Sequence, residues 1–293
     1  MNNISNIEVK MDYFHVDVFT EEVLSGNGLI VVFCNQELED HLMLNLAKEF
    51  KQFETIFLRR KEDHIFCARI FTVDEELDFA GHPILGAAAT IHSHFFENKE
   101  DLVVTFQLNN KTVLTTSKKK SNCYNVQMNQ GKPQFICNLL EEDNGKYVQA
   151  LNLSEENLSK EFPLEVISTG LPYLLVPLRS GIENAKIICS NFEVMLEEVN
   201  AKFAYVFDVN NMEGRTWDNQ GKVEDVATGS AAGPVGAYLY KHSIANANKE
   251  IIINQGRFVG RPSKIKVYKS ACGEEIIVEG DVAILAKGII LPF

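Results

Sequence analysis

The chain has 293 residues, enough for one large domain or two domains of ordinary size, and we expect two. Hydrophobic residues make up 45% of the chain and charged residues 23%, a composition typical of globular proteins and not of disordered or collagen-like ones. The formal net charge of −12 repels phosphate backbones and anionic membranes, so neither nucleic acid nor a membrane surface is an expected partner.

The six cysteines form no C-x-x-C pair, and a chain of this length does not depend on disulfides, so we expect reduced thiols. The first ten residues lack the charged start and apolar run of a secretory signal. No stretch of the sequence reaches the apolar length that a transmembrane helix needs. These features predict a cytoplasmic protein.

The first part of the chain alternates between strand patterns and two helices. Residues 13–34 predict two strands joined through a turn at Gly26-Asn27-Gly28, and residues 38–50 carry apolar side chains at helical spacing. Strands are expected at 54–58 and 65–72. After Phe79 the sequence becomes small and apolar, which predicts a helix to about residue 98 that closely packed neighbours surround on all sides.

The second part of the chain begins near the polar run at 117–122, where we place a domain junction. The predicted domains are residues 1–120, completed by 281–293, and residues 121–280. Within the second domain we expect a helix over 151–159, and a second small-residue helix begins near Gly229. The expected strands are 164–168, 173–178 and 203–209, followed by a strand-rich tail.

The two small-residue segments suggest an internal repeat. When Gly81 is placed on Gly229, Glu76 falls on Glu224, and the two segments lie about half the chain length apart. Chance similarity between Ala- and Gly-rich segments is the alternative. If two similar halves face each other, both helix N-termini can point into one cleft, where their backbone N–H groups favour a carboxylate.

Several common chemistries are excluded by motif. The chain has no dinucleotide fingerprint, no phosphate-binding P-loop and no G-x-S-x-G elbow around a serine nucleophile. His92 and His94 lie two residues apart on one predicted helix and therefore point to different faces, so they do not form a zinc site. We expect no metal and no cofactor.

Three titratable residues remain near the two helix starts. His82 precedes Pro83 in the first turn of one helix, where the alternative is a structural histidine. Asp225 precedes the other helix and could simply cap it, as could Thr228. Glu54 opens an apolar strand, where burial raises a carboxyl pKa toward that of a working acid and base, although a glutamate at such a junction is usually exposed.

An ordered set of motifs covers nearly the whole chain and resembles the PhzF-like family of phenazine biosynthesis proteins. The motifs occupy residues 16–20, 26–27, 54–57, 79–88, 168–170, 224–231 and 255–263. The resemblance implies an α+β fold similar to diaminopimelate epimerase. In this fold two similar halves each wrap a β-barrel-like sheet around a central helix, with the active site between the halves. The resemblance also implies a homodimer.

The resemblance also implies roles for individual residues. Glu54 corresponds to the general acid and base that moves a proton between two carbons, and His82 and Asp225 to its polar partners. Gly81, Gly229 and Ser230 correspond to the helix starts that bind the substrate.

The chain departs from the family pattern at two positions. Val226 and Gly28 each stand where proline is usual, and Val226 restores a backbone N–H, so its loop is expected to be less rigid.

The sequence thus predicts an isomerase that acts on a small carboxylic acid without a cofactor. Related racemases of this fold use two cysteines, one at each helix start, and none of the six cysteines falls there. The alternatives are a non-catalytic module that binds a metabolite or protein in the same cleft, and an epimerase with a second base that the sequence does not identify.

Overall fold

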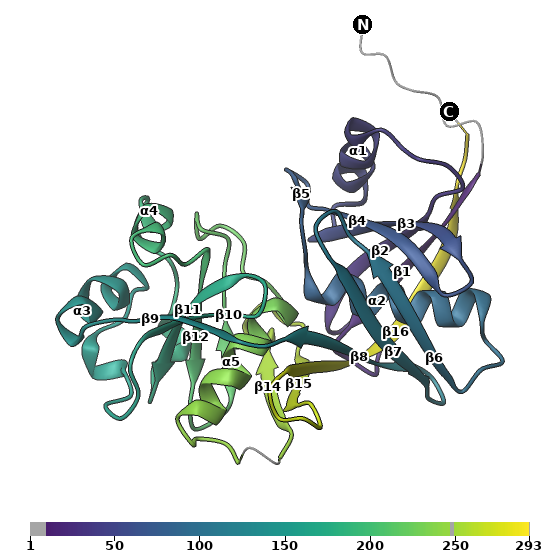
Figure 1. Cartoon of the computed structure of the whole chain (residues 1–293). Helices are drawn as coiled ribbons and strands as arrows, with labels where there is room; N and C mark the ends of the chain where they lie inside the picture. The colour runs from purple at the N-terminus through teal and green to yellow at the C-terminus, as the bar shows by residue number, and fades with distance from the viewer. Residues whose placement is uncertain (1–9, 247–248, 293) are drawn as a thin grey trace, which may run out of the picture. The chain divides into compact units, whose positions relative to one another are not determined.

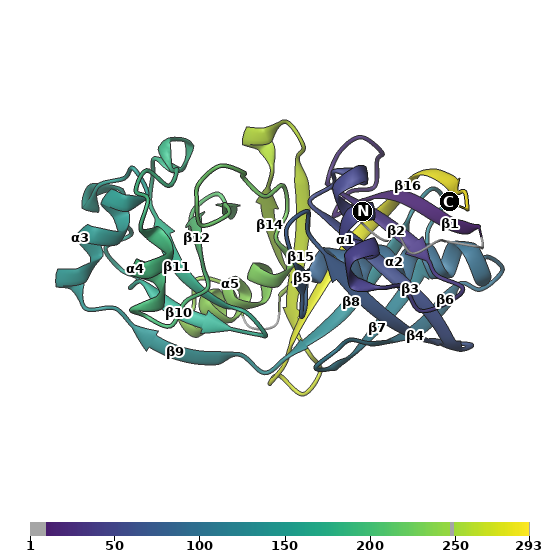
Figure 2. The same ribbon diagram turned by 90° about the horizontal axis from the view of Figure 1, so that it is seen from above.

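The computed structural model describes residues 10–246 and 249–292. The chain forms an α+β fold with two compact units (Figures 1 and 2). Unit 1 is Met1–Met128 with Glu279–Phe293, and unit 2 is Asn129–Val278. The domain boundaries expected from the sequence remain a prediction, because compactness does not show that a segment folds independently.

In unit 1 the strands form a closed ring. The strand order is β1-β2-β3-β4-β6-β7-β8-β16, and β16 also pairs with β1. The short strand β5 (Glu76–Leu77) pairs with β4. The bounds are β1 Met11–Val18, β2 Asn27–Phe33, β3 Glu54–Glu62, β4 Ile65–Phe71, β6 Asp101–Gln107, β7 Thr112–Lys119, β8 Tyr124–Gly131 and β16 Ile276–Ile290. The predicted polar run at 117–122 contains the end of β7 and the turn that leads to β8.

Helix α2 (Gly81–Phe95) is the central helix of unit 1 and packs against β1, β2, β3, β6 and β7. It can be buried on all sides because its residues are small. A Cβ atom on Gly86 would lie only 2.4 Å from Leu29 Cδ2, so a larger residue would push the helix off β2. Helix α1 (Asp40–Phe50) is amphipathic, as predicted, and buries Leu42, Met43, Leu46 and Ala47.

Unit 2 also has a central helix, α5 (Gly229–Lys241), which packs against β10, β11 and β15 (Figure 2). From β16 the strand order runs β15-β14-β13-β12-β11-β10-β9. The bounds are β9 Gln134–Asn138, β10 Glu165–Ser168, β11 Pro172–Leu178, β12 Phe203–Asp208, β13 Glu213–Arg215, β14 Ile251–Gln255 and β15 Ser263–Lys269. Two further helices, α3 (Glu141–Ala150) and α4 (Phe192–Glu197), complete unit 2.

The helix predicted over 151–159 is wrong: the α-helix of this region is α3, which ends at Ala150. Three acidic residues in its first turn favour this start, because they interact well with the positive end of the helix dipole. Ser154 and Asn157 then close a capping box around a single 3-10 turn, so the following residues do not continue the helix.

The repeat suggested by the sequence recurs as an ion pair in each unit. Arg69 on β4 binds Glu76 through two hydrogen bonds of 2.8 and 2.5 Å, and Arg215 on β13 binds Glu224 through two of 2.8 and 2.6 Å. Each glutamate precedes a central helix by five residues. The two halves are therefore similar in the segments that lead into α2 and α5. Of the helices within the described ranges, none has the length and apolarity to cross a lipid bilayer.

Candidate active site

Unit 1 brings together two of the predicted catalytic residues. Glu54 is the first residue of β3 and His82 the second residue of α2. His82 Nε2 lies 3.2 Å from Glu54 Oε2, and the two residues are only 3% and 5% exposed. The expectation that a glutamate at this junction is usually exposed therefore does not apply to Glu54. A buried carboxyl beside an imidazole is an arrangement suited to proton transfer.

Burial keeps the His82 imidazole neutral. It lowers the pKa of His82 to about 3, because the low-dielectric interior disfavours the charged ring. Its place in the first turn of α2 acts in the same direction, since the helix dipole is positive there. His82 can thus donate or accept a hydrogen bond near neutral pH, but it does not carry a positive charge.

This shifted pKa predicts an acid-sensitive stability. In the unfolded chain His82 binds a proton as the pH falls through about 6.5, whereas in the folded chain it stays neutral to about pH 3. Between these two pH values, acidification lowers the free energy of unfolding. Above about pH 6.5 His82 is neutral in both states and makes no contribution to the pH dependence of the stability. From about pH 7.5 to about pH 5 we expect His82 to lower the free energy of unfolding by about 2 kcal/mol. Urea unfolding at both pH values measures it.

The variant that removes this effect is His82→Gln, which should lose less stability on acidification than the wild type. A matched control is His41→Gln, because it makes the same substitution at an exposed histidine. Identical pH dependence in the wild type and His82→Gln would contradict a buried neutral imidazole.

In unit 2, Asp225 lies three residues before the N-cap residue of α5, Thr228. The Thr228 hydroxyl donates to Asp225 Oδ2 at 2.6 Å, and the Thr228 side chain makes no cap hydrogen bond at the helix start. The reading of Thr228 as a side-chain cap is therefore not supported, and the reading of Asp225 as a helix cap stays an alternative. Helix α2 likewise begins without a side-chain cap, at Ala80, and neither helix has an acidic residue in its first turn.

Gln255 holds the Asp225 segment and was not predicted as a site residue. Its amide nitrogen donates to the Asp225 carbonyl and to Thr228 Oγ1, each at 2.9 Å. Its amide oxygen accepts from the Thr228 N–H at 3.1 Å and from the Tyr205 hydroxyl at 2.9 Å. Burial raises the pKa of Tyr205, so this hydroxyl remains a neutral donor. The only signal in the sequence was the family motif that begins at Gln255.

The predicted binding residues of unit 2 lie in the first turn of α5. Gly229 is its first residue, and its carbonyl accepts a hydrogen bond from Gln130 at 2.8 Å. Ser230 follows, with its hydroxyl 2.7 Å from that of Tyr173, which no sequence motif singled out. Their counterpart in unit 1, Gly81, is the first residue of α2.

The two departures from the family pattern have local explanations. A Cβ atom on Gly28 would lie 2.4 Å from the side-chain oxygen of Gln52, so glycine makes room for that amide. The carbonyl of Val226 would lie 2.6 Å from a Cβ atom on Gly256, which has a φ of +85°. Glycine at 256 leaves room for this carbonyl in a backbone conformation that other residues rarely adopt.

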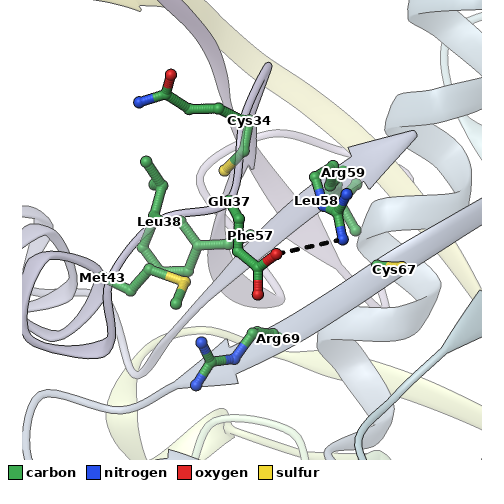
Figure 3. A pocket seen from close by; sticks show the side chains of 10 residues that line it. Cys34, Glu37, Leu38, Met43, Phe57, Leu58, Arg59, Cys67 and Arg69 are labelled. Carbon is green, nitrogen blue, oxygen red and sulfur yellow. Dashed lines mark ion pairs between the residues drawn. The ribbon is translucent and has the colours of Figure 1, made fainter. Parts of the chain in front are cut away.

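A small cavity of unit 1 contains none of the predicted site residues (Figure 3). It lies between α1 and strands β3 and β4, and its volume of about 60 Å³ is sufficient for a few water molecules but not for a metabolite. Glu37 and Arg59 form an ion pair of 3.8 Å at its edge. This cavity is therefore not the candidate active site.

One group of possible metal ligands, Glu21, Cys123 and Asp281, lies in unit 1. The Lys120 ammonium already lies 2.8 Å from Glu21 and 2.7 Å from Asp281. Because this cation compensates both carboxylates, we assign no metal to the group.

Comparisons with known proteins show the family and the relatives of this chain. The family described as phenazine biosynthesis-like protein matches residues 16–288. The uncharacterized isomerase YddE of Escherichia coli is 27% identical, over 94% of this chain and 97% of its own. Trans-2,3-dihydro-3-hydroxyanthranilate isomerase of Pseudomonas aeruginosa is 28% identical, over 94% and 98%. A solved structure of a predicted epimerase from Pseudomonas aeruginosa has a TM-score of 0.91 at 40% identity, over 96% and 99%.

Proposed function

This chain belongs to the phenazine biosynthesis-like family and is an isomerase, and we propose that it moves a proton within a small carboxylic acid without a cofactor. The observation that carries the proposal is the buried pair of Glu54 and His82, with 3.2 Å between the carboxylate oxygen and Nε2. A carboxylate with one positioned partner can accept and return a single proton.

In the proposed reaction Glu54 acts as base and then as acid. A C–H bond of the substrate breaks, its proton passes to a Glu54 oxygen, and its electron pair shifts along the substrate to form a new double bond. Glu54 then returns the proton to a different carbon, so no atom or electron is gained or lost. Neutral His82 does not supply the proton, because its pKa is too low for it to be charged, but it can hold Glu54 or the substrate by a hydrogen bond.

We propose that the residues of unit 2 bind and polarise the substrate. The first turn of α5 presents the backbone N–H groups of Gly229 and Ser230 and contains no acidic residue of its own, which favours a carboxylate. Asp225, held by Thr228 and Gln255, supplies a fixed polar partner. In unit 1, Gly81 has the corresponding position at the start of α2. The homodimer and the cytoplasmic location remain predictions.

The test is solvent exchange. The protein is incubated in D₂O with a panel of small carboxylic acids that begins with trans-2,3-dihydro-3-hydroxyanthranilate, the compound named in one relative. We expect one acid to change its double-bond position and to acquire carbon-bound deuterium, because the proton held by Glu54 can exchange with D₂O before it is returned. NMR and mass spectrometry detect both changes. If the protein only binds metabolites, the acid should stabilise it against unfolding, but the acid should acquire no carbon-bound deuterium.

Epimerisation is the second candidate, because the 40% identical structure is described as a predicted epimerase. It would require a second acid or base on the opposite face of the reacting carbon. Chiral chromatography of the product separates the two reactions: an epimerase inverts one centre and keeps the double bonds, whereas the proposed isomerase moves a double bond.

A further inference from the structure

The imidazole of His82 lies between two side chains. Nε2 faces Glu54, and Nδ1 lies 3.5 Å from the side-chain nitrogen of Asn27. Asn27 is only 1% exposed, and no motif reasoning gave it a role beyond the turn that precedes it. Its amide therefore belongs to the immediate surroundings of the proposed acid and base.

Strand register explains why these three side chains meet. Leu29 on β2 pairs with Glu54 on the parallel strand β3, so their side chains share a face of the sheet. Leu29 lies against Gly86 of α2. Two residues earlier on β2 is Asn27, and four residues earlier on α2 is His82. Two residues of a strand and four residues of a helix both span about 6 Å. Asn27 therefore lies beside His82, just as Leu29 lies beside Gly86 one step further along both elements.

The contact with Asn27 determines which ring nitrogen carries the proton. A side-chain amide nitrogen can only donate, so His82 Nδ1 must accept. A neutral imidazole has one N–H, which is then on Nε2. Nε2 lies 3.2 Å from Glu54 Oε2, although these two atoms do not have the geometry of a hydrogen bond in this structure. The opposite orientation of the amide would place the proton on Nδ1, which is a measurable difference.

We propose that Asn27 is a positioning residue: it holds His82 in the tautomer with the proton on Nε2. Nε2 lies 3.2 Å from the Glu54 carboxylate and can donate to it after a small rotation of the ring. This inference rests on the proposed function of Glu54. A hydrogen bond donated in this way favours the carboxylate over the carboxylic acid and fixes the direction of its oxygens, and the carboxylate is the form that can accept a proton from the substrate.

The first test is NMR of the full chain with ¹⁵N-labelled histidine near neutral pH. Long-range ¹H–¹⁵N correlations distinguish the two neutral tautomers, and the signals of His82 are assigned by their loss in His82→Gln. We expect a protonated Nε2 and an unprotonated Nδ1. A proton on Nδ1 in the wild type would overturn the inference, and this measurement needs no variant of Asn27 that folds.

The second test is Asn27→Asp, which replaces the side-chain amide donor with a carboxylate acceptor of nearly the same shape. A carboxylate accepts, so Nδ1 of His82 should gain a proton, and kcat for the acid found by solvent exchange should fall about tenfold or more with a smaller change in KM. The matched control is Asn35→Asp, an exposed residue just beyond the other end of β2, which should change neither the tautomer nor kcat.

The outcomes separate this inference from the proposed function. An unchanged tautomer in Asn27→Asp, or a changed tautomer with full kcat, would rule out the positioning role. Full activity of Glu54→Gln together with a proton on Nε2 in the wild type would rule out the proposed role of Glu54 but leave the tautomer assignment in place.

Discussion

Glu54→Gln should lower kcat by about 10²- to 10⁴-fold while changing KM little, because glutamine keeps the shape of the side chain but cannot carry the transferred proton. The substitution also preserves a polar group within reach of His82, so the buried cluster is not emptied. The measurement is the steady-state rate with the acid identified by solvent exchange, together with its deuterium incorporation. Loss of exchange and turnover by the same factor would assign the proton transfer to this carboxyl.

The matched control is Glu62→Gln. Glu62 is the last residue of β3 and is exposed, so the same substitution on the same strand should leave kcat unchanged. Urea unfolding of both variants shows whether either has lost stability. Turnover by Glu54→Gln at close to the wild-type rate would show that another group moves the proton.

Arg215→Met should cost about 3–5 kcal/mol of stability, because it leaves the Glu224 carboxylate buried without its cation. The two side chains are only 9% and 10% exposed. Arg215 also donates to the carbonyls of Ile182 and Glu183 and packs over Trp217. The free energy of unfolding in urea measures the loss.

Arg59→Met is the control for the Arg215 prediction. Arg59 forms an exposed 3.8 Å pair with Glu37, and its removal should cost less than about 1 kcal/mol. The double variant Arg215→Met with Glu224→Leu should recover much of the lost stability, since it removes the unpaired charge. Equal losses in Arg215→Met and Arg59→Met would show that burial does not govern the strength of these pairs.

The Arg215 pair also bears on the site. Glu224 immediately precedes Asp225, whose N–H donates to the carbonyl of Thr216, the residue after Arg215. The ion pair and this hydrogen bond hold the segment that carries Asp225 against the end of β13. Arg69 and Glu76 hold the corresponding segment before α2 in unit 1, but they are about a quarter exposed, so their loss should cost less.

Local patterns predicted most of the elements. Alternating apolar residues marked β1, a continuous apolar run marked β2, helical spacing marked α1, and small residues marked α2 and α5. The apolar spacing did not predict α3. Its first turn is polar and it contains Gly145, so the two buried residues Tyr147 and Val148 do not form a recognisable helical pattern. These two residues belong to the core of unit 2, so tertiary packing and not helix propensity selects this segment.

The sequence alone determined the family resemblance, the two small-residue helices and the candidates Glu54, His82 and Asp225, because each depends on residue types in short segments. Only the tertiary structure decided that Glu54 meets His82, that Asn27 lies on the other side of the ring, and that Gln255 holds Asp225. These contacts join residues that are about 30 or more positions apart in the chain. Strand register and helix packing set their positions, and no local pattern carries that information.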